Sequence, residues 1–155
     1  MTNLVLHKIE LQSSLEKNTQ AMSAVKTEHN DFDLNKIFPL NNQYDPNEAC
    51  AYWGVKRNSE ETVTNDNCIY FNSAIESPTK LIALFAAQHQ LDMTVYAQEE
   101  SREFWHKHVY KNGILVEMSG GVVGQLKLEK VDEKVKASLH EVNKHIDEYI
   151  DVWSA

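Results

Sequence analysis

The sequence predicts an α+β fold in which helices cover one face of a mainly antiparallel β-sheet. Two observations indicate this class: short β-rich runs alternate with segments of helical periodicity, and an Asn-Gly pair between two such runs is typical of a hairpin. The chain has 155 residues, 42% of them hydrophobic, without a break in composition. We therefore expect one domain over residues 1–155, with a core over 1–126 and a C-terminal helix over 127–155.

The chain begins with the pattern of a strand followed by a helix. The run NLVLHKIELQ, residues 3–12, alternates as a strand does, and Ser13 with Glu16 forms a capping-box pattern that opens a helix. We expect this helix to bury one face made of Leu15, Met22 and Val25. The apolar run DFDLNKIFPL, residues 31–40, is too irregular for a strand and predicts a loop that packs against the core.

The stretch AYWGVKRN predicts the end of a short helix. Asp45 suits its N-cap, and Gly54 can take the left-handed conformation that ends it, so Trp53 falls on the last turn. One interpretation makes Trp53 a packing anchor, because large aromatic side chains are usually well buried. The other makes Trp53, Lys56 and Arg57 a grip for an anionic ligand. We adopt the structural interpretation.

The second half of the chain carries clearer strand signals. We expect residues 58–67 to form a polar surface loop, and 119–130 to form an edge strand or a glycine-rich loop. A helix should begin at Ser77 and Pro78. The expected strands are 68–74, 92–98 and the two arms of a hairpin around Asn112 and Gly113, and the last helix runs from Val131 to Trp153. This order of elements suggests an α+β sandwich, of which the ferredoxin-like fold is the commonest form, with the long amphipathic helix added at the C-terminus.

Composition restricts the environment and the partners. The formal net charge of −8 disfavours binding to nucleic acid at long range and favours either ordinary solubility or a basic protein partner. Cys50 and Cys68 lack the spacing of a metal or redox motif, and we expect reduced, buried thiols and no cofactor. The sequence contains neither a signal-peptide pattern nor a membrane-length apolar run, so we expect a cytoplasmic protein without membrane contact.

Five segments in order carry a family resemblance: FDLNKIFPL, YWGVK, YFNSAIESP, LDMTVYAQE and VYKNGILVE. Together they resemble the YubB-like family of ferredoxin-like domains, which occurs in proteins of bacterial plasmids, phages and integrated elements. The resemblance implies this fold and a bacterial host cell, and it implies no reaction. Arg57 and Ile75 stand where the family prefers aromatic residues, which puts a ligand site there in doubt.

The hairpin gathers the only local group of candidate catalytic or metal-binding residues. A two-residue turn pairs Tyr110 with Leu115 and His108 with Glu117, and side chains alternate between the sheet faces. His106 and His108 then share the more polar face with Glu117, opposite an apolar face made of Trp105, Val109, Ile114, Val116 and Met118. Such a group suits a zinc ion or an acid–base pair, as in a small metal-dependent hydrolase. A half-solvated sheet face is the simpler interpretation.

Three function classes follow. The first is a non-enzymatic, protein-binding protein of a mobile element, for example an inhibitor of a host defence system of the anti-CRISPR or anti-restriction type, with acidic surfaces that include Glu99, Glu100 and Glu103. The second is the hydrolase. The third is nucleic-acid binding through Phe104 and Tyr110 on the exposed sheet face, which the acidic charge disfavours.

The C-terminal helix has an apolar stripe with a spacing close to seven residues. Its far end carries Ile146, Ile150 and Trp153. Two interpretations are open: this end is exposed and binds a partner or a second copy as a homodimer, or the helix lies across its own sheet.

Overall fold

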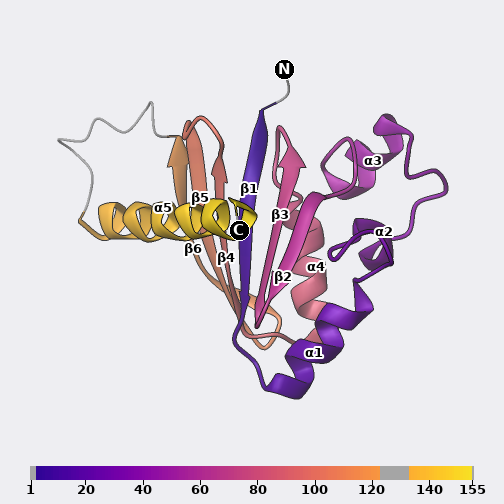
Figure 1. The fold of residues 1–155 in the computed structure, drawn as a ribbon, viewed down its shortest axis with the longest axis horizontal. Helices are drawn as coiled ribbons and strands as arrows, with labels where there is room; N and C mark the ends of the chain where they lie inside the picture. Colours follow the sequence, from indigo (N-terminus) through magenta and orange to yellow (C-terminus); the bar gives the residue numbers. More distant parts are fainter. Residues whose placement is uncertain (1–2, 123–132, 155) are drawn as a thin grey trace.

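A computed structural model of the chain describes residues 3–122 and 133–154 (Figure 1). The α+β class is confirmed. In chain order the elements are β1 (Leu4–Leu11), α1 (Leu15–Ala24), α2 (Leu34–Ile37), α3 (Pro46–Trp53), β2 (Glu60–Asn65), β3 (Cys68–Ala74), α4 (Thr79–His89), β4 (Met93–Glu99), β5 (Phe104–Lys111), β6 (Ile114–Val122) and α5 (Glu133–Ser154). The expected domain limit at residue 127 lies outside the described residues.

The strands form one sheet in the order β2-β3-β1-β4-β5-β6. Each of the five pairings between neighbours is antiparallel. Two connections contain helices, and each joins strands that have one other strand between them: β1 to β2 passes β3, and β3 to β4 passes β1. As a result β1, the first strand of the chain, is paired on both sides in the middle of the sheet.

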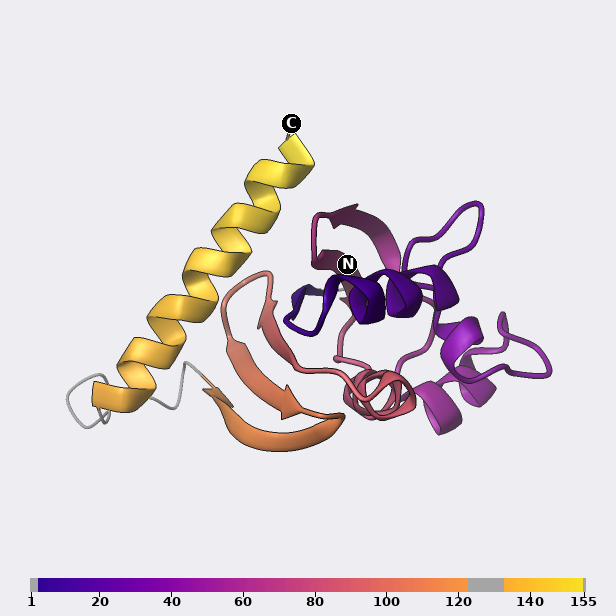
Figure 2. The ribbon, with the colours of Figure 1, turned by 90° about the horizontal axis from the view of Figure 1, so that it is seen from below.

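The molecule has three layers, as Figure 2 shows: α5 lies on one side of the curved sheet and the other helices lie on the opposite side. The main hydrophobic core joins α1, α2, α3 and α4 to the sheet and includes Ile9, Trp53, Phe71, Phe85 and Val95. A second, smaller cluster lies under α5 and consists of Tyr96, Trp105, Val142 and Ile146, with Leu6 beside it. Both faces of the central strands are therefore covered.

The α3 corner follows from its capping residues. The Asp45 side chain accepts a hydrogen bond from the backbone N–H of Asn47, and Gly54 ends the helix with a φ of 77°. Trp53 is 0% exposed, and its indole Nε1 donates to the carbonyl oxygen of Phe38 at 2.8 Å. A large aromatic ring that is buried with its polar atom satisfied is a packing anchor.

The hairpin turn has the expected left-handed conformation at both central positions. Asn112 and Gly113 have φ angles of 50° and 78°, which is typical of a type I′ turn. The tip is also held in place, because the N–H of Gly113 donates to the carbonyl oxygen of Leu91 at 2.8 Å. A Cβ atom at Gly113 would lie 2.8 Å from the carbonyl oxygen of Ala86, so glycine is needed there for close approach to α4.

Two segments expected to be loops are regular structure. Residues 60–65 form β2, an edge strand that pairs with β3 through a tight turn in which Asp66 has a φ of 53°. Its polar, half-exposed side chains concealed it, because an edge strand needs no continuous apolar face. Residues 34–37 form α2, whose N-cap is Asp33. The segment 119–130 contributes its first residues to β6, up to Val122.

The predicted face of the first helix is correct in part: Val25 is buried in the main core and Met22 packs against it, but the cap and Leu15 differ from the prediction. Ser14, not Ser13, is the N-cap and accepts from the N–H of Lys17. Leu15 is exposed, whereas Asn18 and Ala21 are buried. The Asn18 amide donates to the carbonyl oxygen of Ser13 at 3.2 Å, so a polar residue occupies an interior position that the apolar pattern gave to Leu15.

The anchor role of Trp53 predicts a contrast with its neighbour Tyr52, which is exposed. Trp53→Ala should lower the free energy of unfolding by about 3–5 kcal/mol, because it leaves a cavity and removes the contact with the Phe38 carbonyl. Tyr52→Ala is the matched control and should change it by less than about 1 kcal/mol. Denaturant melts of both variants measure the difference. Similar values for the two would contradict the anchor role.

Candidate functional site

A row of alternating tyrosine and lysine side chains crosses the four middle strands on the face under α5. Lys8 of β1 lies opposite Tyr70 of β3 and Tyr96 of β4, and Tyr96 lies opposite Lys107 of β5. Side chains at opposed positions share one face of a sheet. The ammonium groups lie near the rings, with Lys8 Nζ 5.8 Å from the Tyr70 centroid and Lys107 Nζ 5.9 Å from that of Tyr96. We call Tyr70, Lys8, Tyr96 and Lys107 the Tyr–Lys row.

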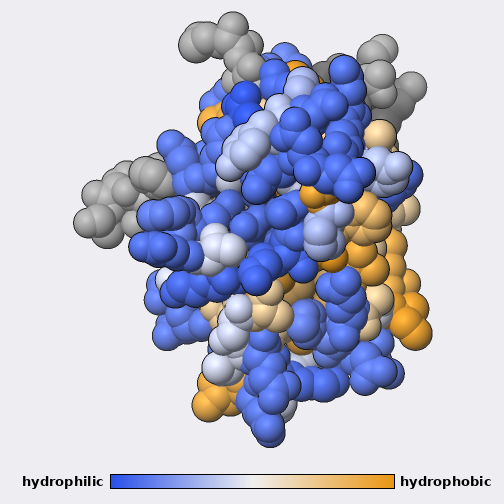
Figure 3. All heavy atoms as spheres, turned by 90° about the vertical axis from the view of Figure 1, so that its right-hand side faces the viewer, coloured by the Kyte–Doolittle hydropathy of each residue, from blue (hydrophilic) through white to orange (hydrophobic). Residues whose placement is uncertain are grey.

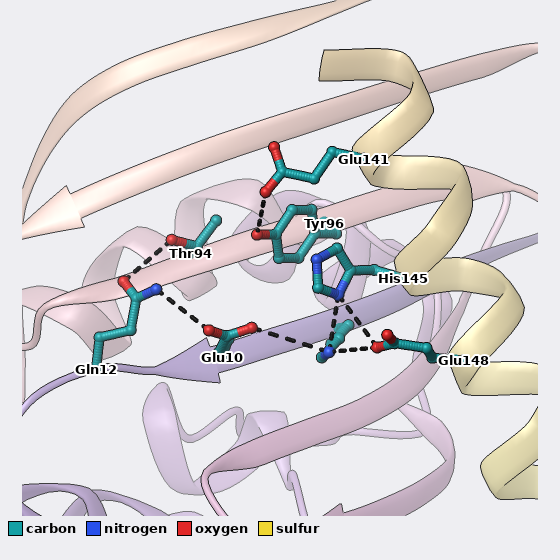
Figure 4. Close-up of polar contacts among 8 residues, drawn as sticks. Glu10, Gln12, Thr94, Tyr96, Glu141, His145 and Glu148 are labelled. Atoms are coloured by element: carbon teal, nitrogen blue, oxygen red, sulfur yellow. Dashed lines mark hydrogen bonds and ion pairs between the residues drawn. The ribbon is translucent and has the colours of Figure 1, made fainter. Parts of the chain in front are cut away.

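Helix α5 covers this row with polar side chains (Figure 4). Lys8 Nζ donates to Glu148 Oε2 and to His145 Nδ1, each at 2.8 Å. Lys107 Nζ donates to Glu141 Oε2 at 2.7 Å, and the Tyr96 hydroxyl donates to Glu141 Oε1 at 3.1 Å. These contacts fix α5 over the sheet by charge and hydrogen bonding as well as by the small cluster around Ile146.

One aromatic contact lies between the two charged ones. The His145 ring stacks on Tyr96 with 3.8 Å between centroids and 21° between planes. His145 Nδ1 lies 2.8 Å from Lys8 Nζ and 3.3 Å from Glu148 Oε2. Because a lysine ammonium can only donate, we assign Nδ1 as an acceptor from Lys8 in a neutral ring with its proton on Nε2. Burial lowers the pKa of His145, and Lys8 lowers it further, against the nearby carboxylates.

The Glu141 and Glu148 carboxylates are held in their charged form. The hydrogen bond from Lys8 holds the pKa of Glu148 below its usual value. Partial burial opposes ionisation of Glu141, but hydrogen bonds from Lys107 and Tyr96 outweigh it and keep the pKa of Glu141 low. Lys8 is 5% exposed, and a buried ammonium needs such partners because desolvation of an unpaired charge costs several kcal/mol.

Further polar residues continue this network along β1. Glu10 Oε2 lies 3.8 Å from Lys8 Nζ, and Gln12 links Glu10 to Thr94 through its amide (Figure 4). Away from the row, Arg102 donates to Asp147 of α5 at 2.9 Å between solvent-exposed groups. The face under α5 is thus largely polar, unlike the opposite face.

Strand β6 presents a second surface of interest. Ile114, Val116 and Met118 are 65%, 57% and 69% exposed, and Leu115 is exposed beside them. Because β6 is the last strand in the sheet order, its outer edge has no strand partner within residues 3–122 and 133–154. An exposed apolar edge strand is a template for pairing with another extended chain.

The predicted hairpin register is correct near the turn and wrong beyond it. Tyr110 lies opposite Leu115, but a β-bulge follows, so His108 lies opposite Met118 and Glu117 lies opposite Val109. One inserted residue moves the following side chains to the other face. Glu117 is exposed and does not share a face with the histidines, so the set expected for the hydrolase is not brought together.

The face assigned to the histidines is also corrected. His106 lies opposite Ala97, and His108 lies opposite Val95, which belongs to the main core. They therefore point toward the side of the sheet that α1 to α4 cover, where the two ring centroids lie 4.4 Å apart in a stacked arrangement. The polar alternation of β5 did not reveal this, because both faces of the strand are covered.

A third histidine, His7, joins this group from β1. Its ring lies 6.3 Å from that of His106 and stacks on Phe71 at 4.2 Å, and its Nε2 lies 2.7 Å from the hydroxyl oxygen of Ser77. Burial, with His106 nearby, holds the pKa of His7 well below its ordinary value. Burial, assisted by His108, lowers the pKa of His106 from 6.5 to about 3. These rings are neutral members of the core.

The residues predicted to bind a partner are scattered. Tyr110, Glu99 and Ile146 are buried, which excludes them as an open surface: Tyr110 lies in the main core, Ile146 packs under α5, and the Glu99 carboxylate accepts from Ser101. Phe104 is half-buried, and Glu100 and Glu103 are exposed. The side chains of Ile150 and Trp153 lie outside the described residues.

The basic pair of the AYWGVKRN stretch lies at the surface. Lys56 and Arg57 line a shallow pocket together with the exposed ring of Tyr44, and Arg57 pairs with Glu60. Trp53 is not part of this pocket. The grip proposed for Trp53, Lys56 and Arg57 is therefore not assembled.

A comparison with protein families, curated proteins and solved structures finds no match for the chain. The resemblance to the YubB-like family stays an expectation. Within the described residues, no three His, Cys, Asp or Glu side chains are grouped so that they could hold a metal ion. None of the helices in that part of the chain is long and apolar enough to cross a membrane.

The Tyr–Lys row escaped sequence reasoning because its members come from four strands. Each residue is ordinary in its own strand, and only the registers of β1 with β3 and β4, and of β4 with β5, align them. A usable signal was present: Lys8 interrupts the apolar alternation of a strand that should be buried. A charged residue in such a place needs partners from elsewhere.

The buried histidines predict that stability falls as the pH falls below 7. Their pKa values are lower in the folded than in the unfolded chain, so the unfolded chain takes up protons first, near pH 6.5. The loss continues until the pH reaches the folded pKa. Denaturant melts at pH 7 and pH 5 measure it. In His106→Gln the difference between the two pH values should shrink by on the order of 1 kcal/mol.

His29 offers the control for this experiment, because its side chain is 88% exposed. His29→Gln should leave the pH dependence as it is in the unmodified chain. An unchanged pH dependence in His106→Gln would show that this ring is not held neutral in the core.

Proposed function

We propose that the chain is a non-enzymatic, protein-binding protein of ferredoxin-like fold, encoded by a bacterial mobile element, and that β6 is its binding edge. The observation that carries the proposal is the exposure of Ile114, Val116 and Met118 on a strand that has no outer neighbour in the part of the chain that the structure describes. Main-chain groups of such an edge supply affinity for an extended segment, and the alternating side chains supply specificity.

The topology supports the ferredoxin-like assignment. Strands β1 to β4 have the spatial order β2-β3-β1-β4, and both of their helical connections pass over one intervening strand. This is the plan of a β-α-β-β-α-β unit. β5 and β6 extend that unit at the β4 side, which places the apolar edge on an addition to the basic plan.

The partner we propose is a basic protein segment that adds to β6 in extended form. The chain has 23 acidic and 15 basic residues, and Glu117 is exposed within β6 itself. Figure 3 shows hydrophilic side chains over most of the side that carries α1, α2 and α3, with apolar surface along one margin. A host defence protein that binds nucleic acid would have the required positive charge. We place the protein in the cytoplasm of the bacterial host.

Substitution of β6 tests this proposal. Val116→Lys with Met118→Lys should leave the fold intact, because both side chains are exposed. The two new positive charges on β6 should oppose the addition of a basic segment to this edge. Capture from lysate of the bacterial host should yield a stoichiometric protein with the unmodified chain, reduced at least about tenfold with the variant.

Leu15→Lys is the matched control. Leu15 is an apolar residue at the start of α1 that is more exposed than Val116 or Met118, and its substitution should leave capture unchanged. Melting curves of all three proteins verify folding. Capture that survives the β6 substitutions, or is lost equally in the control, contradicts a binding role for β6.

A further inference from the structure

Helix α5 places a regular alternation of charge and ring on the Tyr–Lys row. Glu141, His145 and Glu148 are four and three residues apart, which puts them on one helix face. Glu141 lies on Lys107, His145 on the Tyr96 ring, and Glu148 on Lys8. The row therefore receives an anion, a flat ring and a second anion, in that order across the strands.

This arrangement has the chemistry of a strand of nucleotides. Aromatic side chains on a sheet bind single strands by stacking on the bases, and lysines bind the phosphates between them. The His145 ring takes the place of a base on Tyr96, and the two carboxylates take the places of phosphates. We infer that the Tyr–Lys row is a binding site for single-stranded nucleic acid and that α5 occupies it as an acidic, displaceable mimic.

The polar contacts described between α5 and the row are of a kind that a nucleic acid can replace. Within the described part of α5, Val142 and Ile146 are the apolar side chains buried against the sheet, and the remaining contacts named above are polar. Charged contacts are exchangeable, because a phosphate can replace a carboxylate on the same lysine. An oligonucleotide offers both lysines the same kind of partner, so the buried ammonium of Lys8 and the partly buried ammonium of Lys107 are not left unpaired during exchange.

The net charge does not decide the outcome at this site. A total of −8 slows the approach of a polyanion at long range, but screening confines that effect to about 10 Å at moderate salt. At contact the relevant charges are those of the row, where Lys8 and Lys107 face α5 and Glu10 lies at the margin. Neutralising the carboxylates of α5 should therefore raise the affinity.

The test uses the full chain and fluorescein-labelled oligo(dT) and oligo(rU) at moderate salt, about 0.1 M, where the net charge is screened. Glu141→Gln with Glu148→Gln removes both mimicked phosphates but keeps polar side chains at positions that are 41% and 43% exposed. We expect this variant to bind at least one of the oligonucleotides about tenfold more tightly than the unmodified chain. The two probes distinguish RNA from DNA as the preferred strand, and either preference supports the site.

Two controls separate the site from general charge. Glu16→Gln with Glu28→Gln changes the net charge equally at exposed positions outside the row and should bind as the unmodified chain does. Adding Lys107→Gln to the α5 variant should remove the gain and reduce the slope of log affinity against log salt by about 0.7. No gain in the α5 variant, an equal gain in the surface control, or a gain that survives Lys107→Gln would each overturn the inference.

Hydrogen exchange gives a readout that does not depend on the variant. If nucleic acid and α5 compete for the row, saturating oligonucleotide should speed exchange of the α5 amides in the unmodified chain, because competition acts in both directions. Unchanged α5 exchange in the bound chain would place the nucleic acid elsewhere and overturn the inference. Self-association of the α5 variant in sedimentation, without oligonucleotide binding, would assign the uncovered face to a protein contact instead.

Discussion

The double-sided burial of β1 is the constraint on which the other features depend. This strand is paired with β3 and β4, and its side chains alternate between two covered faces: Ile9 enters the main core, and Lys8 lies under α5. The apolar face requires the layer of α1 to α4. The buried lysine requires anionic partners, and α5 supplies Glu148 for it. Each layer of helices thus covers one of the two sets of alternating side chains of β1.

The elements that sequence reasoning predicted are those determined by local chemistry. The α3 corner needs only the Asp45 cap and Gly54, and the hairpin turn needs only Asn112 and Gly113. β2 was missed because a polar edge strand is recognised through its neighbour and not through its own pattern. The bulge between Val109 and Tyr110 was missed because one extra residue leaves no mark in composition. It places Glu117 on the opposite face from His108.

The two candidate sites also differ in how far the local sequence determines them. The exposed residues of β6 follow one another in the chain, although their exposure depends on β6 being the last strand. The Tyr–Lys row exists only through the registers of four strands and the docking of α5, which are properties of the whole fold. The histidine group His7, His106 and His108 is a similar product of register, and desolvation makes its members neutral core residues.

The two faces of the sheet also differ in the contacts that hold their covering layers. On the side covered by α1 to α4, removal of α4 would expose Leu81, Ile82 and Phe85 to water. No other ligand could replace that burial without an equal apolar area. On the other side, Val142 and Ile146 bury a smaller apolar cluster, and Glu141 and Glu148 hold α5 to lysine ammonium groups that can also bind phosphate. The acidic residues that make the whole chain repel polyanions therefore include those that satisfy its buried lysines. Net charge describes the sum of these groups, whereas recognition depends on which of them can be exchanged.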